Sequence, residues 1–421
     1  MSADALPSPW RHPILHAGDL VANRLPPGGR RAGWWEARLW LAVSPLGFAG
    51  LRLGGRRAVV PLGRFGTLVN EPALGRRILM DPERFRTVGP GTHGELMDLA
   101  IGERALLNMD GADHETLRRA LGPLFSPAAA AELVADTVEA PIADAVARLR
   151  AGERVDLARL VRIVTGRTTF ALLGAPTPTD GDAGYLASYR LGEQLVGMTV
   201  RAIRRGVRPG ELEAAKALVA RLGAPGRAGW DAGGGTIGRL RELGFDWDTA
   251  RALVVVIVLA GTETVSSAAP RIVALLADHG RWGALDGGRD DAVDAAIEAG
   301  LRLTTPTEVI VRSAAVDTEI DGHRFRAGRR VFLSVYGMTR WRALYAGDPE
   351  ALRLGEPLPR ELRHLWFGAG PHFCLGAPIA REQLRRILGA VAAFPELWIV
   401  DRRPAPGVLF PAYGRLVVAA R

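Results

Sequence analysis

The amino-acid sequence predicts a mainly helical protein with a small β region. Residues 126–225 are rich in alanine and leucine with helical periodicity, and glycine and proline break the pattern near Gly152, 175–178 and 208–210. Residues 246–278 form another helical run, which would be about 50 Å long. Patterns typical of strands occupy only a few short segments. A length of 421 residues suits two ordinary domains or one large one, and 48% hydrophobic residues can bury a sizeable core.

Composition excludes several classes of protein. The single cysteine cannot form an intrachain disulfide, which favours a reducing cytoplasm. The net charge is +9, but its arginines are spread along the chain, so the clustered basic stripe of a nucleic-acid-binding protein is not expected. Residues 1–31 hold no continuous apolar core, and we expect no signal peptide. The longest uncharged apolar run, Ala252–Gly261, is about half a membrane span, so a membrane protein is not expected either.

The N-terminal part alternates between helix and strand signals. Residues 33–52 are rich in tryptophan, and we expect an N-terminal helix packed over the mouth of a substrate pocket, with a helix lying on a membrane surface as the alternative. Short β-like runs in residues 58–69 predict a hairpin around Gly63–Gly66, and residues 71–80 predict a helix. Asp110 or Asp113 is expected to cap the next helix.

The C-terminal third holds the remaining strand signals. Thr307–Arg312 alternates like a strand. Residues 318–331 are expected to form turns between short strands. Near the end of the chain, Val408–Pro411 and Arg415–Val418 predict a hairpin whose tip is Ala412–Gly414.

The segment Phe367–Gly376 reads F-G-A-G-P-H-F-C-L-G and contains the only cysteine, Cys374. A free cysteine is most often a small buried hydrophobe. Here three glycines let the backbone turn tightly, and a helical run, 377–393, follows at once. A thiolate at a helix N-terminus is stabilised by the N–H groups and the dipole. Such a sulfur could bind a metal, or attack a substrate with a base such as His372 beside it.

The spacing F-x-x-G-x-H-x-C-x-G resembles the haem-binding loop of the cytochrome P-450 family, the haem-thiolate monooxygenases. The resemblance implies that Cys374 is the thiolate ligand of haem b (iron protoporphyrin IX). It also implies that Phe367 shields the sulfur and that loop N–H groups around Gly368 and Gly376 tune it. His372 would reach a haem propionate.

Residues Ala260-Gly261-Thr262-Glu263-Thr264 interrupt the apolar helix 246–278. A glycine and a carboxylate are each costly in a buried helix. They could simply admit a crossing helix and reach solvent. The segment also matches completely the family's oxygen-activation motif, A-G-x-[D/E]-T. The resemblance implies that Ala260 and Gly261 leave space beside the haem. Glu263 would relay protons, and Thr264 would donate a hydrogen bond to dioxygen.

Two further matches concern the haem propionates. His114 and Arg118 are spaced i, i+4 on one helix face, where a surface ion cluster with Glu115 is the ordinary interpretation. The family carries H-x-x-x-R at this place to hold a propionate. It also places a strand beside the haem with an arginine on a propionate, and Arg312 fits that position.

One departure concerns Arg302. The family usually has E-x-x-R here, but Ala299 occupies the glutamate position. Glu298 lies four residues before the arginine, so we expect it to be the replacement partner. A backbone carbonyl from the segment before the cysteine loop, or water, is the alternative. Arg353 is the candidate for the later arginine that the family uses with this pair.

The resemblance covers roughly residue 58 to the C-terminus. It implies the cytochrome P-450 fold, with a haem domain at 58–421 and an N-terminal segment, 1–57, packing on it. The haem would lie between the long central helix and the helix after the cysteine loop.

The implied function is a cytoplasmic monooxygenase that uses O2 to hydroxylate or otherwise oxidise a small organic, secondary-metabolite substrate. Electrons would come from a separate ferredoxin and ferredoxin reductase, and the acidic partner would dock on Arg119, Arg381 and Arg385. Oxidative phenol coupling or ring formation without oxygen insertion is an alternative, as is a non-catalytic haem-binding protein. A peroxide-driven enzyme is disfavoured because Glu263 and Thr264 are both present.

Overall fold

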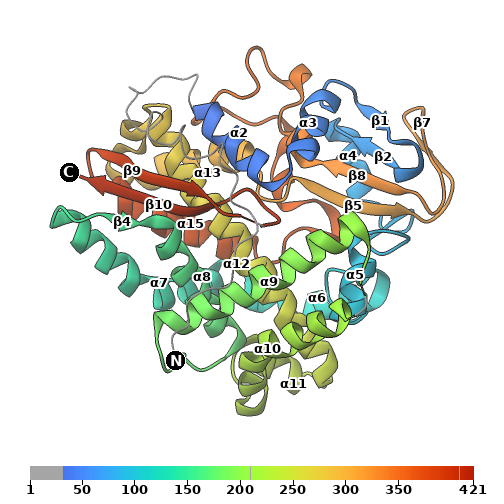
Figure 1. The fold of residues 1–421 in the computed structure, drawn as a ribbon, viewed down its shortest axis with the longest axis horizontal. Helices are drawn as coiled ribbons and strands as arrows, with labels where there is room; N and C mark the ends of the chain where they lie inside the picture. Colours follow the sequence, from blue (N-terminus) through green and yellow to red (C-terminus); the bar gives the residue numbers. More distant parts are fainter. Residues whose placement is uncertain (1–31, 209, 407) are drawn as a thin grey trace.

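Helices packed around one central helix, α12 (Trp247–Asp278), make up most of the protein (Figure 1). The computed structural model describes residues 32–208, 210–406 and 408–421. The predicted mainly helical fold with a small β region is confirmed. The other α-helices are α2 (Ala32–Val43), α3 (Pro45–Gly54), α4 (Pro72–Leu79), α5 (His93–Ala100), α6 (Gly111–Leu121), α7 (Pro127–Arg150), α8 (Leu157–Leu173), α9 (Asp182–Arg205), α10 (Glu211–Ala232), α11 (Gly235–Glu242), α13 (Asp290–Thr304), α14 (Val335–Met338) and α15 (Ala377–Ala392).

Three small sheets flank the helices. The largest has the strand order β1-β2-β8-β5-β3, and only its β2–β8 pair is parallel. The predicted N-terminal hairpin is confirmed, because β1 and β2 pair antiparallel around the turn at Gly63–Phe65. A second sheet has the order β4-β10-β9, and β6 and β7 form a two-stranded ribbon. The strands are β1 (Val59–Pro61), β2 (Thr67–Val69), β3 (Phe85–Arg86), β4 (Val155–Asp156), β5 (Val309–Ala314), β6 (Thr318–Ile320), β7 (His323–Phe325), β8 (Arg330–Ser334), β9 (Leu397–Pro404) and β10 (Tyr413–Ala420).

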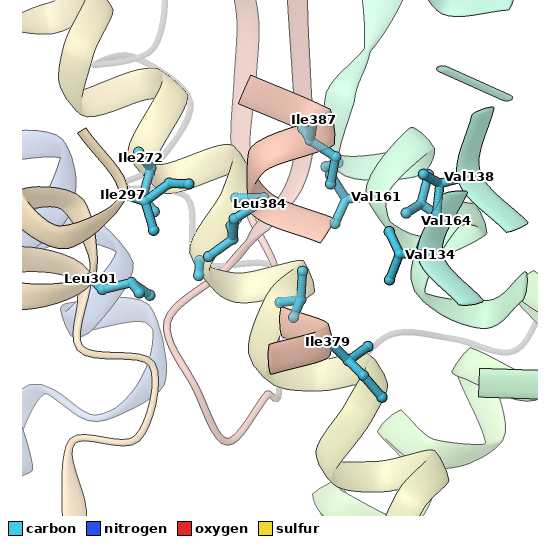
Figure 2. Close-up of a cluster of buried hydrophobic side chains, with 14 of the residues drawn as sticks. Val134, Val138, Val161, Val164, Ile272, Ile297, Leu301, Ile379, Leu384 and Ile387 are labelled. Carbon is cyan, nitrogen blue, oxygen red and sulfur yellow. The ribbon is translucent and has the colours of Figure 1, made fainter. Parts of the chain in front are cut away.

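Helix α12 crosses the molecule as predicted. The Asp246 carboxylate caps it by accepting a hydrogen bond from the Thr249 N–H at 2.8 Å. It is the one helix in the described residues that is long and apolar enough to span a membrane, but 78% of its apolar window is buried inside the protein. The apolar character is therefore that of a core helix. Figure 2 shows Ile272 of α12 beside α13 residues Ile297 and Leu301, and Leu384 of α15 close by.

The tryptophan-rich segment folds as two helices rather than one. Ser44 separates them and caps α3 by accepting a hydrogen bond from the Gly47 N–H at 3.2 Å. Trp35 and Leu39 of α2 belong to the main hydrophobic core. Glu36 forms an ion pair with the fully buried Arg271 of α12 at 2.6 Å. Residues 32–54 therefore pack on the rest of the chain, and their place over a substrate mouth stays a prediction.

The C-terminal hairpin differs from the prediction. Its strands are β9 and β10, and the connecting loop is 405–412. Residues 408–411 are not a strand, and the tip is not at Ala412–Gly414, because Tyr413 already pairs with Pro404. Pro404, Pro406 and Pro411 lack the N–H groups that a longer ladder would need. The loop nevertheless reaches α12, since the Pro411 carbonyl accepts a hydrogen bond from the Ser267 hydroxyl at 2.7 Å.

Candidate functional site

Helix α12 is open at the predicted position. Residues 252–258 are all buried, whereas Ala260 and Gly261 are exposed and Thr264 is half-buried. The Thr264 hydroxyl donates a hydrogen bond to the Ala260 carbonyl at 2.8 Å. Small residues and a threonine thus face an accessible space from an otherwise enclosed helix. The helix is therefore accessible at these positions.

The cysteine loop folds tightly before α15. Gly368 has φ +79° and Gly370 has φ +70°, a backbone region that favours glycine. The Cys374 N–H donates to the Phe367 carbonyl at 2.8 Å, which closes the loop. Burial raises the pKa of the Cys374 thiol, while N–H groups of Gly376 and Ala377 and the charge of Arg118 act in the opposite direction. The N–H groups of Gly376 and Ala377 thus act to stabilise the thiolate form, and the role of Cys374 as a ligand stays a prediction.

A cluster of basic side chains lies beside this loop. The rings of His114 and His372 are in contact, with their centroids 4.2 Å apart and their planes tilted by 31°. Arg118 donates a hydrogen bond to the carbonyl of Phe373, the residue before the cysteine. His114 is buried, so the alternative of a surface ion cluster with Glu115 is wrong.

Asp110 organises the cluster. It occupies the N-cap position of α6, but its side chain makes no capping hydrogen bond. Its Oδ1 lies 2.9 Å from His372 Nε2, and its Oδ2 accepts from the Thr87 N–H at 3.0 Å and hydroxyl at 2.8 Å. Although burial acts to raise it, these contacts hold the pKa of Asp110 below its usual value. The capping prediction for Asp110 is wrong because His372 and Thr87 take both oxygens.

Two buried basic side chains of the cluster lack anionic partners among the described residues. His114 Nε2 is fully enclosed and has no hydrogen-bond partner there, and burial, with the charges of His372 and Arg118, lowers the pKa of His114 to about 4, so the ring is neutral. Arg312 is 8% exposed, and its one hydrogen bond among the described residues goes to the carbonyl of neighbouring Val311 at 3.0 Å. Burial lowers the pKa of Arg312 to about 10, with only a partial opposing effect of Asp110. Buried cations are normally paired, so this arrangement fits a ligand that brings its own carboxylates. A haem, with two propionates and an iron for the thiolate, meets that need.

Glu263 lies in a polar network that the sequence did not reveal. It is 5% exposed, and its Oε1 has no hydrogen-bond partner. Burial and the nearby Glu193 raise the pKa of Glu263 to about 8, while Arg162 and Tyr189 partly oppose this. The Arg162 guanidinium lies 5.1 Å from the Tyr189 ring centre and donates to the Tyr413 carbonyl at 2.9 Å. Glu263 therefore carries a proton near neutral pH.

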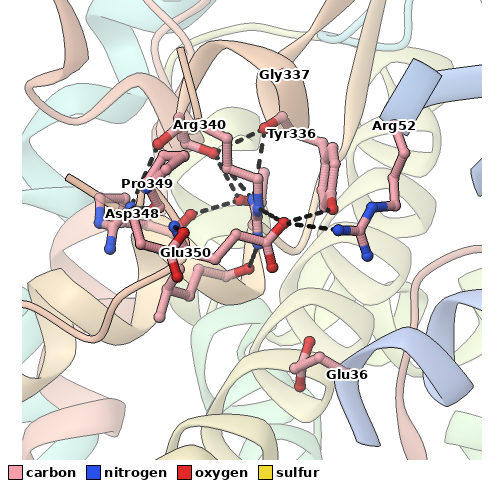
Figure 3. A network of polar contacts seen from close by, with 12 residues as sticks. Glu36, Arg52, Tyr336, Gly337, Arg340, Asp348, Pro349 and Glu350 are labelled. Atoms are coloured by element: carbon pink, nitrogen blue, oxygen red, sulfur yellow. Dashed lines mark hydrogen bonds and ion pairs between the residues drawn. The ribbon is translucent and has the colours of Figure 1, made fainter. Parts of the chain in front are cut away.

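Arg302 is fully buried and is held without a carboxylate. Its Nη1 donates to the Pro349 carbonyl at 2.6 Å, and its Nη2 donates to the Ala351 carbonyl. The Tyr345 hydroxyl lies 3.4 Å from Nη1 and itself donates to the Thr339 carbonyl at 2.6 Å. Figure 3 shows Pro349 in a polar network with Tyr336, Arg340 and Glu350.

The predicted Glu298–Arg302 pair is wrong. Glu298 forms an ion pair with Arg381 of α15 and lies 3.9 Å from His364. The alternative of carbonyls from the segment before the cysteine loop is the correct one. The Arg353 guanidinium lies 5.5 Å from the Tyr345 ring centre, so the two arginines flank one tyrosine.

The structure gathers the predicted site residues into three connected groups. The cysteine loop contacts the propionate candidates His114 and Arg118, and the Ala260–Thr264 segment lies on α12, which packs against α15, the helix that follows the loop. Phe367 contacts Phe373 and Arg381 through its ring. Asp110, Arg162, Tyr189 and Glu193 are the residues that sequence reasoning missed or misassigned. Of these four residues, only Asp110 could have been found from the sequence, because it is an acidic residue just before the helix that contains His114.

Comparison with known proteins agrees with this geometry. Residues 292–392 match the family model "Cytochrome P450". The 20-oxo-5-O-mycaminosyltylactone 23-monooxygenase of Streptomyces fradiae is 29% identical over 75% of this chain and 72% of its own length. A steroid C26-monooxygenase of Mycolicibacterium smegmatis is 33% identical over 31% of this chain and 32% of its own. The crystal structure of CalO2 superposes with a TM-score of 0.73 and 25% identity, over 90% of this chain and 97% of CalO2. The chain therefore has the cytochrome P450 fold and is similar in sequence to cytochrome P450 monooxygenases, proteins whose cofactor is haem b.

Proposed function

We propose that this protein is a haem-thiolate monooxygenase in which Cys374 ligates the iron. The observation that carries the proposal is the buried basic cluster beside the cysteine loop, where, among the described residues, His114 Nε2 has no hydrogen-bond partner and the Arg312 guanidinium has no ion pair. His114, Arg118, Arg312 and His372 would bind the two propionates. When bound, the haem supplies the activation of dioxygen, and the protein supplies ligation, protons and shape.

The α12 residues have separate roles in this proposal. Ala260 and Gly261 give the haem and dioxygen room. The Thr264 hydroxyl, which donates to the Ala260 carbonyl, would be the hydrogen-bond donor toward dioxygen, and Glu263 would hold a proton for delivery to it. A carboxyl group with a pKa near the working pH is well suited to pass protons.

The substrate is a small organic molecule of the secondary-metabolite type. The Streptomyces fradiae relative is named for such a substrate, a mycaminosyltylactone.

Bacterial relatives take electrons from separate redox proteins, and we infer a ferredoxin and its reductase, acting in the cytoplasm. In the described residues, Arg381 pairs with Glu298 and Arg385 with Asp294, which reduces their attraction for an acidic partner. Arg119 is exposed and is the stronger docking candidate. We infer a haem domain at 58–421; of the N-terminal segment 1–57, residues 1–31 lie outside the described residues, and residues 32–54 pack on the rest of the chain.

The altered Arg302 region does not favour the non-catalytic alternative. Its guanidinium is held by two carbonyls and a tyrosine, so the loss of the usual glutamate leaves the anchoring of the segment before the cysteine loop intact.

The test begins with the carbon-monoxide difference spectrum of the reduced holoenzyme. The wild type is expected to show the thiolate-type band, and Cys374→Ser is expected to lose it. A band that persists in Cys374→Ser contradicts the ligand assignment. Arg312→Met should lower haem retention on heating, whereas the matched variant of exposed Arg281, Arg281→Met, should not.

Turnover with isotope-labelled dioxygen then tests the reaction. One labelled oxygen atom in the product supports the monooxygenase. A product that has lost hydrogen without gaining oxygen supports coupling or ring formation instead.

A further inference from the structure

Glu308 is a buried carboxylate that the proposed chemistry does not use. It is half-buried as a residue, but its Oε1 atom is fully enclosed and has no hydrogen-bond partner. Within the described part of the chain, its carboxylate accepts a hydrogen bond only from its own backbone N–H and forms no ion pair. An unpaired buried carboxylate is costly, so its retention calls for a ligand or a role.

Strand geometry places Glu308 on the haem side of β5. Alternate residues of a strand point to the same face. Glu308, Ile310 and Arg312 are spaced two residues apart, so they lie on one face of β5 and of the residue that precedes it. Pairing continues to this residue, because the Glu308 carbonyl accepts from the Tyr336 N–H at 3.1 Å. A Cβ atom at Gly368 of the cysteine loop would lie 3.9 Å from Ile310 Cδ1. Arg312 belongs to the basic cluster. Glu308 is thus the next residue along the face that borders the haem site.

Helix α12 limits the site from the other side. Arg271 interacts electrostatically with Glu308 and lies seven residues after Thr264, almost two full turns, so both project from the same helix face. Glu308 therefore lies near the part of α12 that continues from the proposed oxygen site.

Arg271 cannot serve as the counter-ion of Glu308. Its Nε and Nη2 donate to the Glu36 carboxylate at 3.1 and 2.6 Å. Its Nη1 donates to the Ser267 hydroxyl at 3.1 Å and the Pro411 carbonyl at 3.2 Å. Every nitrogen of the guanidinium is occupied, and burial raises the pKa of Glu308 to about 8. The charge of Arg271 only partly opposes the effect of burial, and the Glu308 carboxylate has no direct ion-pair partner among the described residues.

We propose that Glu308 binds a cationic group of the substrate, of the alkylammonium type. The inference rests on the proposed monooxygenase function and adds a substrate class to it. A single carboxylate next to the apolar side chain of Ile310 suits one compact charge on an apolar carbon skeleton. The protein's net charge of +9 repels cations in general, so a preference for a cationic ligand must come from a local acidic group.

Three probes with one alkyl chain test the proposal: decyltrimethylammonium, decan-1-ol and decanoate. The trimethylammonium group is charged at every pH and has no lone pair with which to ligate iron. Binding to the holoenzyme is measured by equilibrium dialysis and by the spectral shift when the iron-bound water leaves. The wild type is expected to bind the cation at least tenfold more tightly than the alcohol, about 1.4 kcal/mol. Equal affinities, or tighter binding of the alcohol or decanoate, overturn the proposal.

Variants locate the effect. Glu308→Gln and Glu308→Leu should both abolish the preference for the cation, and neither should impair folding, because removing an unpaired buried charge is neutral or stabilising. The matched control Glu132→Gln, at an exposed α7 position, should keep the preference. A preference that survives in both Glu308 variants, or that Glu193→Gln alone removes, overturns the assignment. An intact carbon-monoxide band in the wild type shows that such a failure concerns Glu308 and not the proposed function.

Discussion

Replacing Glu263 by glutamine should make the protein's stability less dependent on pH. The pKa of Glu263 is raised from the usual 4.5 to about 8 in the folded protein, so between these values the folded state binds a proton that the unfolded state has released. Stability from this group is therefore lost as the pH rises from about 4.5 to about 8. The Glu263→Gln variant keeps a neutral side chain of nearly the same shape and loses this dependence.

The magnitude follows from the two pKa values. For a single group moving from 4.5 to about 8, the penalty is about 1.4 kcal/mol at pH 5.5 and about 3.9 kcal/mol at pH 7.5. The wild type should therefore lose about 2.5 kcal/mol more than Glu263→Gln over this interval. Because Glu263 is 5% exposed, solvent screening reduces the effect little.

Urea unfolding of the holoenzyme at the two pH values measures the difference. Glu132→Gln is the control and should follow the wild type. Burial also raises the pKa of Glu308 to about 8, so Glu308→Gln should flatten the profile too, and the double variant should combine both effects. A Glu263→Gln profile parallel to the wild type would refute the protonated state and with it the proton store next to Thr264.

Three further predictions concern turnover and stability. Thr264→Ala loses the hydroxyl that contacts the Ala260 carbonyl; it should keep substrate binding but divert reducing equivalents to peroxide, and an unchanged peroxide yield would contradict the role. Arg119→Glu should slow reduction by ferredoxin at low salt and lose that defect at high salt, and a rate insensitive to both would argue against this docking site. Tyr345→Phe removes one contact of Arg302 and should destabilise the holoenzyme by about 1 kcal/mol, measured by urea unfolding, with no effect expected if carbonyls alone suffice.

The parts of the fold that sequence predicted best have local causes. Asp246 starts α12 because its side chain reaches the Thr249 N–H, three residues away. The turn before Cys374 depends on glycines whose positive φ angles other residues rarely adopt. Ala260 and Gly261 interrupt the run of large apolar side chains in α12, and this interruption is visible in the sequence alone. In each case, residues a few positions apart determine the structure.

The incorrect predictions share a different cause. Asp110 lies at the N-cap position of α6, but its Oδ1 contacts His372, which lies 262 residues later in the chain. Glu298 had Arg302 one turn away on its own helix, but α13 packs against α15, where Arg381 was the nearer cation. Local spacing says which pairs can meet. Local spacing does not predict the partners that tertiary packing brings from other helices and loops.

Arg302 illustrates how a site can keep its function while losing its usual partner. The family pair of arginine and glutamate anchors the segment that leads to the cysteine loop. Here the arginine reaches that segment directly, because its Nη atoms donate to the Pro349 and Ala351 carbonyls. Ala299 is 3% exposed, so no solvent replaces the missing carboxylate. The carbonyl dipoles and the Tyr345 hydroxyl take over the neutralising role, at the cost of leaving Arg302 Nε without a partner. The anchor therefore depends on backbone position rather than on a second charged side chain.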